Sequence, residues 1–209
     1  MSDQQKISSL ILAAGLSSRM GDFKPLMPFR KKTLIENTID SVLLGGAQTA
    51  VVVTGYRGDE LEAFLKSRYG KQILFVRNPH YEETDMMGSI QIGCLALPVC
   101  DAFFLLPGDM PVIHQSTFFK LKKARCADTV SVVIPTLEGY RKHPPLIDAR
   151  LIPNILSFQG DGGLRQLWQQ LGDRIKTVPV DDEGVWVDLD TRQDYQMCRK
   201  NYERSGGIN

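Results

Sequence analysis

The sequence lacks the features that mark several large classes of protein. Its 209 residues contain only four cysteines and three histidines. The cysteines show no Cys-x-x-Cys spacing that would indicate a zinc site, and their pattern does not suggest a disulfide framework. No apolar run is long enough to span a membrane, and the polar first six residues lack the apolar core of a signal peptide. We therefore expect a cytoplasmic protein with reduced cysteines and no membrane partner.

An excess of charge of either sign is also lacking. The chain has 25 basic and 24 acidic residues, a formal net charge of +1, so its balance gives no reason to expect nucleic acid as a partner. Hydrophobic residues make up 43% and charged residues 23%, as in ordinary soluble globular proteins. This length fits one domain. We expect a single domain over residues 1–209, with a core over about 6–199 and a flexible tail at 204–209.

Apolar runs alternate with helical patterns along the chain. The expected strands are Ile7–Ala13, Ala50–Thr54, Ile73–Arg77, Ala102–Leu106, Val130–Ile134, Ile175–Val180 and Val185–Val187. Their apolar runs are nearly continuous, which suits strands covered on both faces. One expected helix begins directly after Thr33, the first residue of a capping box. The other expected helices cover Asp59–Tyr69, Ser89–Leu97, Ser116–Arg125, Leu164–Leu171 and Arg192–Glu203. This alternation predicts an α/β fold with a mostly parallel central sheet and helices on both faces.

The loop after the first expected strand combines small residues with two basic side chains. It covers residues 12–25 and reads LAAGLSSRMGDFKP. Small residues let backbone amides approach an anion closely, and Arg19 and Lys24 add fixed positive charge for a polyphosphate. Neither a P-loop nor the dinucleotide fingerprint matches, because no Gly-Lys-Ser/Thr is present and Ser17 replaces the second glycine. The alternative is an ordinary Gly/Ser loop.

Three aspartates follow expected strands and are candidate metal ligands. Asp109 comes directly after the apolar run 103–106 and suits Mg²⁺, which prefers one or two carboxylates plus substrate phosphates. The alternative is a turn aspartate that bonds its own backbone. Asp188 and Asp190 lie two apart, so in an extended segment both side chains point to one side. The alternative for Asp190 is a cap on the last helix.

Three motifs together resemble the MobA-like nucleotidyltransferases, and among these the molybdenum cofactor cytidylyltransferases. The motifs are LAAGxSxRMGxxK at 12–24, LPGDMP at 106–111 and DLDT at 188–191. The resemblance covers about residues 6–199. It implies a Rossmann-like single domain in which the phosphate of an acceptor attacks an NTP and pyrophosphate leaves. It also implies Mg²⁺ as the cofactor, with Mn²⁺ as another possible ion.

The resemblance assigns roles to named residues. Arg19, Lys24 and Asp109 would be catalytic, and Asp109, Asp188 and Asp190 would hold the metal. The residues expected to bind the nucleotide are Leu12, Ala13, Ala14, Gly15, Ser17, Ser18, Arg19, Lys24, Thr54, Asn78, Gly88, Ser89 and Asp109. Ser89 would open a helix that faces the nucleotide, or serve as an ordinary N-cap. The Ala-Ala-Gly sequence favours CTP, because guanylyl members of the family tend to show Ala-Gly-Gly.

The acceptor side departs from the family pattern. Lys142 stands where the family often has the glycine of Gly-His-Pro, and Met110 lies in Pro-Gly-Asp-Met-Pro instead of the commoner Pro-Ala-Asp-Gln-Pro. The turn at 160–163 resembles the family's Gly-Asp-x-Gly turn, although glycines also suit a flexible turn. Arg141 and Lys142 either bind an acceptor phosphate or face solvent. The residues expected to bind the acceptor are Arg141, Lys142, His143, Gly160, Asp161 and Gly163.

The sequence therefore predicts transfer of CMP from CTP to the phosphate of a molybdopterin-type cofactor. The expected partners are CTP or another NTP, this acceptor, and a client molybdoenzyme that receives the product. One alternative is a nucleotidyltransferase that acts on a sugar phosphate or phospho-alcohol. A second is an accessory protein for molybdoenzyme maturation that binds nucleotide or cofactor without catalysis.

Overall fold

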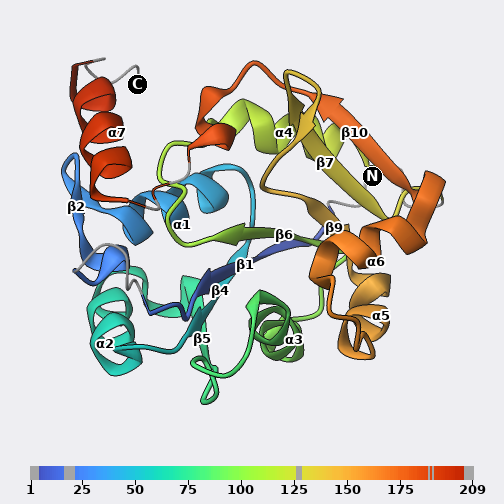
Figure 1. Ribbon diagram of the computed structural model, residues 1–209, viewed down its shortest axis with the longest axis horizontal. Helices are drawn as coiled ribbons and strands as arrows, with labels where there is room; N and C mark the ends of the chain where they lie inside the picture. The colour runs from blue at the N-terminus through green and yellow to red at the C-terminus, as the bar shows by residue number, and fades with distance from the viewer. Residues whose placement is uncertain (1–4, 17–21, 126–128, 188, 190, 205–209) are drawn as a thin grey trace.

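A central sheet organises the computed structural model, which describes residues 5–16, 22–125, 129–187, 189 and 191–204. The sheet has eight strands in the order β10-β7-β9-β6-β1-β4-β5, with β8 paired to β7 (Figure 1). Its strands are β1 (Ile7–Ala13), β4 (Thr49–Thr54), β5 (Ile73–Arg77), β6 (Ala102–Pro107), β7 (Val132–Leu137), β8 (Tyr140–Arg141), β9 (Leu146–Asp148) and β10 (Ile175–Pro179). A separate hairpin joins β2 (Pro28–Phe29) to β3 (Lys32–Thr33).

Most of the long strands run parallel. β1 pairs in parallel with both β4 and β6, β5 pairs in parallel with β4, and β10 does so with β7. The short strand β9 lies between β6 and β7 and runs antiparallel to both. The predicted α/β fold with a mostly parallel sheet is confirmed. The carboxyl ends of β1, β4, β5 and β6 meet at one edge, where α/β proteins bind ligands.

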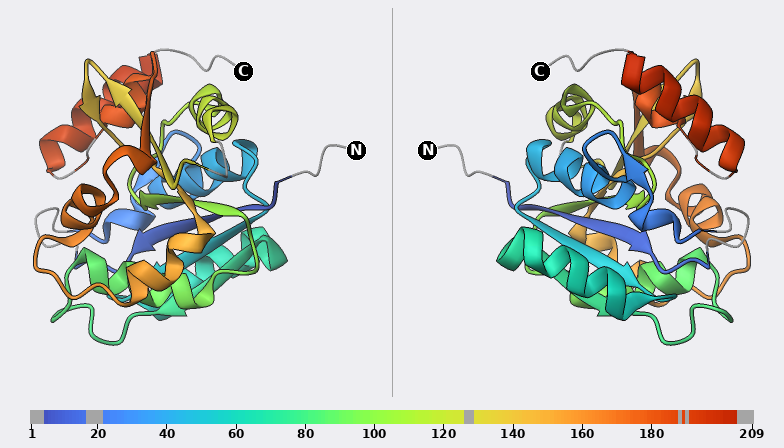
Figure 2. Two further views of the ribbon diagram at one scale, coloured as in Figure 1. Left: turned by 90° about the vertical axis from the view of Figure 1, so that its right-hand side faces the viewer. Right: turned by 90° about the vertical axis from the view of Figure 1, so that its left-hand side faces the viewer.

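Helices cover both faces of the sheet (Figures 1 and 2). They are α1 (Leu34–Leu44), α2 (Gly58–Tyr69), α3 (Met86–Ala96), α4 (Gln115–Ala124), α5 (Ile152–Leu156), α6 (Gly163–Leu171) and α7 (Arg192–Arg204). Ile39, Leu61 and Phe118 belong to the apolar core that joins α1, α2 and α4 to the sheet. A second core contains Ile90 of α3 and Leu167 of α6. Each face therefore buries its own apolar layer.

Three expected elements differ in the structure, and one of them is β7, which covers Val132–Leu137 instead of Val130–Ile134. The run Val185–Val187 is not a strand, because residues 183–186 form a 3₁₀ turn in which the Asp182 carboxylate accepts a hydrogen bond from Gly184 N at 2.9 Å. Helix α3 begins at Met86 rather than Ser89, and the Asp85 side chain accepts a hydrogen bond from Gly88 N at 3.1 Å. The N-cap alternative for Ser89 was therefore wrong, since Asp85 performs that role.

Helix α7 packs beside the β2–β3 hairpin (Figure 1). Phe29, Leu34, Leu189 and Tyr195 belong to a small buried cluster between them, and the Tyr195 hydroxyl donates a hydrogen bond to the carbonyl of Pro28. This packing brings the start of α7 close to the segment that follows the β1 loop. Within the described ranges, no helix is both long and apolar enough to cross a membrane.

Candidate active site

An ion pair between Lys24 and Asp109 lies at the carboxyl edge of the sheet. Lys24 begins a 3₁₀ turn after the β1 loop, and its carbonyl accepts a hydrogen bond from Met27 N at 3.1 Å. Its ammonium pairs with the Asp109 carboxylate, and the two side chains are 12% and 21% exposed. Two residues that are 85 positions apart in the sequence, both predicted to be catalytic, therefore meet in a partly shielded place where their electrostatic interaction is stronger than in water.

The turn that carries Asp109 is held against β1 and α1. Gly108 N donates to the carbonyl of Leu12 at 2.8 Å, and its own carbonyl accepts from Thr38 Oγ1 at 3.1 Å. A Cβ at Gly108 would lie 2.8 Å from Ile35 Cδ1, closer than side chains tolerate. Glycine therefore allows the turn to approach α1, and this approach fixes the position of Asp109.

The first residues of the β1 loop are held by a hydrogen bond from the segment that follows β4. Ala13 and Ala14 are buried, and the carbonyl of Ala14 accepts from Tyr56 N at 3.3 Å. Gly15 is exposed, and apart from its chain neighbours no atom of the described residues lies within 4 Å of the position a Cβ would take. This open space leaves room for a ligand against the backbone. Three further residues predicted to bind the nucleotide lie outside the described residues, namely Ser17, Ser18 and Arg19.

Other polar residues predicted to bind nucleotide are hydrogen-bonded within the protein. The buried Thr54 hydroxyl donates to Glu62 Oε1 at 2.6 Å. The amide of buried Asn78 donates to Thr84 Oγ1 at 2.8 Å and to Ser89 Oγ at 3.0 Å. The Thr54 side chain therefore connects the end of β4 with α2, whereas Asn78 and Ser89 connect the end of β5 with α3. Gly88 lies directly before Ser89 in the first turn of α3 and is partly exposed.

His143 lies between this ion pair and the acceptor side. Its Nδ1 is 3.3 Å from the carbonyl of Leu105 in β6. Burial lowers the pKa of His143 below its ordinary value of 6.5, although the Leu105 carbonyl and the nearby charge of Asp109 act in the opposite direction. We therefore take the imidazole as neutral at pH 7. The neighbouring Lys142 ammonium lies 3.3 Å from the centroid of the Trp186 ring, a cation–π contact.

A cavity of about 780 Å³ opens on the acceptor side, between α3, the β7–β9 region and α6. Its lining includes three cationic side chains, those of Arg141, Lys142 and Arg165, and one carboxylate, that of Asp85. Four of the residues predicted to bind the acceptor line it, namely Arg141, Lys142, His143 and Gly163. Its apolar walls come from Met86, Met87, Ile90, Ile134, Leu164 and Trp168. The cavity thus combines a wide apolar surface with positive charge, which suits a flat molecule that carries a phosphate.

Two residues predicted to bind the acceptor do not line this cavity. Gly160 lines a smaller hollow with Gln166, and Asp161 is exposed elsewhere on the turn. The turn folds back on α6, where Gly162 N donates to Gln166 Oε1 at 3.0 Å. Of the four residues at 160–163, only Gly163 therefore reaches the cavity. Sequence reasoning missed Trp168, and it noted Arg165 beside the 160–163 turn without assigning it to the acceptor, because both positions depend on how α6 packs against α3.

The predicted metal ligands fall into two groups. Asp188 and Asp190 lie outside the described residues, so only Asp109 has a described position. The described part of the chain has no group of three or more His, Cys, Asp or Glu residues that could hold a metal. Mg²⁺, however, needs only one or two protein carboxylates when substrate phosphates complete its shell. The partly exposed carboxylate of Asp109 fits such a site.

Comparisons with known proteins agree with this arrangement. The chain is 29% identical to the molybdenum cofactor cytidylyltransferase of Escherichia coli, over 94% of this chain and 97% of that protein. It is 27% identical to the nicotine blue oxidoreductase of Paenarthrobacter nicotinovorans, over 92% and 95% of the two chains. A solved nucleotidyl transferase from Methanothermobacter superposes with a TM-score of 0.81 at 27% identity, covering 96% of this chain and 99% of that one.

The family match covers most of the chain. Residues 9–175 match the MobA-like NTP transferase domain, a range that includes most of β1, the Lys24–Asp109 pair and the acceptor-side cavity. The predicted resemblance is thereby confirmed. The chain belongs to the MobA-like NTP transferase domain family and is a nucleotidyltransferase.

Proposed function

We propose that this nucleotidyltransferase moves CMP from CTP to the phosphate of a molybdopterin-type cofactor. The observation that carries the proposal is the acceptor-side cavity, which joins apolar walls to three cations next to Asp109 and His143. A tricyclic pterin with a phosphate matches both properties. The likeness to the E. coli cytidylyltransferase over nearly the whole length of both chains supports the same acceptor.

The reaction requires positioning and charge neutralisation rather than a protein nucleophile. An oxygen of the acceptor phosphate attacks the α-phosphorus of CTP, a new P–O bond forms, and the bond to the leaving pyrophosphate breaks. Lys24, together with Arg19, would offset negative charge on the triphosphate. Asp109 would hold Mg²⁺ with Asp188 or Asp190, and the ion would supply charge neutralisation on the phosphate oxygens. Arg141 and Arg165 would bind the acceptor phosphate.

The β1 loop supports CTP as the donor. Ala14 is buried, and its carbonyl oxygen lies against Gly55. A Cβ added to Gly55 would lie only 2.6 Å from that oxygen. The backbone there has little room to shift, so Ala14 restricts the space beside the expected base position. One methyl group contributes roughly 1–3 kcal/mol of discrimination. We therefore expect a preference for CTP that is clear but not absolute.

The test is pyrophosphate release with Mg²⁺, measured with CTP, GTP, ATP and UTP in separate reactions. Each nucleotide is combined with molybdenum cofactor or with a panel of sugar and alcohol phosphates. Release with CTP only when the cofactor is present is the expected result. Pyrophosphate release with a sugar or alcohol phosphate instead would show that the acceptor is not the molybdenum cofactor. Tight binding of nucleotide or cofactor without pyrophosphate release would favour an accessory role.

Because the chain is also similar to the nicotine blue oxidoreductase, a second assay tests for oxidation of a nicotinamide reductant. The loop after β1 has no Gly-x-Gly-x-x-Gly fingerprint, so it gives no support to a dinucleotide reductant. The same enzyme preparation is incubated with NADH or NADPH and quinone-like dyes, and absorbance at 340 nm is followed. Steady oxidation of the reductant, with no pyrophosphate formed in the first assay, would overturn the proposed transfer reaction.

A further inference from the structure

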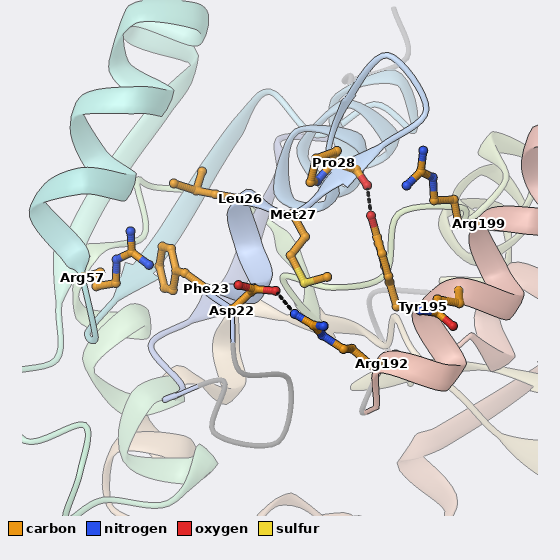
Figure 3. Close-up of a pocket in the computed structure, with 10 residues that line it drawn as sticks. Asp22, Phe23, Leu26, Met27, Pro28, Arg57, Arg192, Tyr195 and Arg199 are labelled. Carbon is orange, nitrogen blue, oxygen red and sulfur yellow. Dashed lines mark hydrogen bonds and ion pairs between the residues drawn. The ribbon is translucent and has the colours of Figure 1, made fainter.

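A second cleft lies on the opposite side of the segment that carries Lys24. It has a volume of about 490 Å³ and lies between the start of α2, residues 22–28 and α7 (Figure 3). Phe23 lines this cleft, whereas its neighbour Lys24 pairs with Asp109 in the candidate active site. None of the residues predicted from the sequence to bind nucleotide, acceptor or metal lines the described walls of this cleft.

Positive charge is concentrated around the cleft. Arg57, Arg192 and Arg199 all line it and are exposed, and Asp22 is the one carboxylate among its described lining residues. Three cations and one anion give a formal charge of +2, in a chain whose total is +1. Guanidinium groups from two helices far apart in the sequence therefore face one hollow, which is an arrangement suited to a phosphate.

The ion pairs already present show how an anion would be held. Arg192 pairs with the Asp22 carboxylate at 2.5 Å (Figure 3), and Arg57 pairs with Glu60 at 2.6 Å. The side chains of all four residues are more than 40% exposed, so each pair contributes little to stability. A phosphate dianion accepts more hydrogen bonds than one carboxylate and can therefore displace Asp22 from Arg192.

The floor of the cleft is apolar and partly aromatic. Phe23, Met27 and Tyr195 are each less than a tenth exposed, and all three line it. The Arg57 guanidinium lies 4.9 Å from the centre of the Phe23 ring. Arg57 also has a left-handed backbone, with φ at 51°, a conformation that is unfavourable for a residue with a side chain. This backbone directs a cation over an aromatic floor.

We propose that this cleft binds a small molecule in which a phosphate is attached to an aromatic or heterocyclic ring. The ring would lie on Phe23, Met27 and Tyr195, and the phosphate would contact Arg192 and Arg199. The volume falls within the range of small-molecule sites, about 300–1,000 Å³. Neither Lys24 nor Asp109 lines this cleft, and its existence does not depend on which acceptor the enzyme uses.

The test is titration of 1-naphthyl phosphate into the full chain, by calorimetry, in buffer that contains a chelator. The chelator suppresses metal-dependent binding at Asp109. We expect a saturable site that is at least tenfold weaker in an Arg192→Gln/Arg199→Gln variant and unchanged in Arg141→Gln/Arg165→Gln. The matched control is Lys200→Gln, because Lys200 is an exposed cation of α7 that does not line the cleft. It should bind the probe like the unmodified chain, and thermal unfolding confirms that all variants are folded.

Three results would overturn the proposal. The first is loss of binding in Arg141→Gln/Arg165→Gln rather than in the α7 variant, which would move the probe to the acceptor-side cavity. The second is equal affinity for 1-naphthol, which would mean that the arginines do not recognise the anion. The third is absence of saturable binding up to millimolar probe. Because the assay involves no turnover, failure of the proposed transfer reaction would not change its outcome.

Discussion

Among single residues, Asp109 has the most direct connection to the chemistry. Its carboxylate pairs with Lys24 and lies at the edge where β1 and β6 end. We expect Asp109→Asn to lower kcat for pyrophosphate release at least 100-fold, because charge neutralisation of the phosphates depends on it. Stability should fall by only about 1 kcal/mol, since both side chains retain some solvent contact, which corresponds to a Tm lower by about 2–4 °C.

The control for this variant is Asp181→Asn. Asp181 also pairs with a lysine, Lys120, but its side chain is 99% exposed and lies away from the candidate site. Its replacement should change neither kcat nor Tm measurably. Full activity of Asp109→Asn, or its failure to fold at 25 °C, would contradict the assigned role.

His143 predicts a specific dependence of stability on pH. Burial lowers its pKa below 6.5, so at mildly acidic pH the unfolded chain binds a proton that the folded chain does not. The free energy of unfolding must then decrease as pH falls through 6.5 towards the lowered pKa, whereas the slope from this group vanishes about one pH unit above 6.5. In His143→Gln, urea unfolding between about pH 7.5 and pH 5 should show a smaller loss of stability. An identical slope in both proteins would show that His143 is not buried in its neutral form.

At the scale of elements, α1 connects the core to the catalytic turn. The Thr38 hydroxyl lies in the middle of α1, is fully buried and donates to the Gly108 carbonyl. We expect Thr38→Val to cost about 1 kcal/mol of stability through the lost hydrogen bond. It should also lower kcat by roughly three- to tenfold, because the turn that carries Asp109 loses an anchor. Thr38→Ser keeps the hydroxyl and should restore kcat, and an unrestored kcat would indicate a packing effect instead.

The elements that sequence reasoning found share a long, continuous pattern. β1 and β5 have the predicted bounds, because buried parallel strands are apolar over their whole length. Thr33 and Glu36 form the predicted capping box of α1. The short strands β8 and β9 were missed, because two or three residues cannot show a period. For the same reason the run Val185–Val187 was misread as a strand.

The candidate site was predictable only in part, and the reason is geometric. Lys24 and Asp109 follow buried strands, so the rule for parallel sheets is enough to bring them to one edge. The walls of the acceptor-side cavity come instead from the packing of α3 against α6. In the sequence Met87, Ile90 and Trp168 look like any core residue, and nothing local shows that they face a hollow.

At the scale of the whole molecule, the acceptor-side cavity draws on three segments that are far apart in the chain. Met86 and Met87 come from α3, Arg141 from β8, and Arg165 from α6. The segments meet because α3 and α6 pack on the same face of the sheet and because β8 extends from β7. In the proposed reaction α6 and β8 would contact the acceptor and the β1 loop would contact the nucleotide, so binding of the two substrates should be separable by mutation on α6.

Arg165 provides the test of this separation. It is exposed at the cavity and lies on α6, away from the β1 loop. Loss of a charge-assisted contact at an exposed position is worth about 1 kcal/mol, so Arg165→Gln should raise the KM for the acceptor roughly fivefold. The KM for CTP and kcat should stay unchanged, because uniform binding of one substrate is all that is lost. Arg174→Gln, an exposed arginine outside the cavity, should change none of these. A rise in the KM for CTP would show that the two substrates share this side of the molecule.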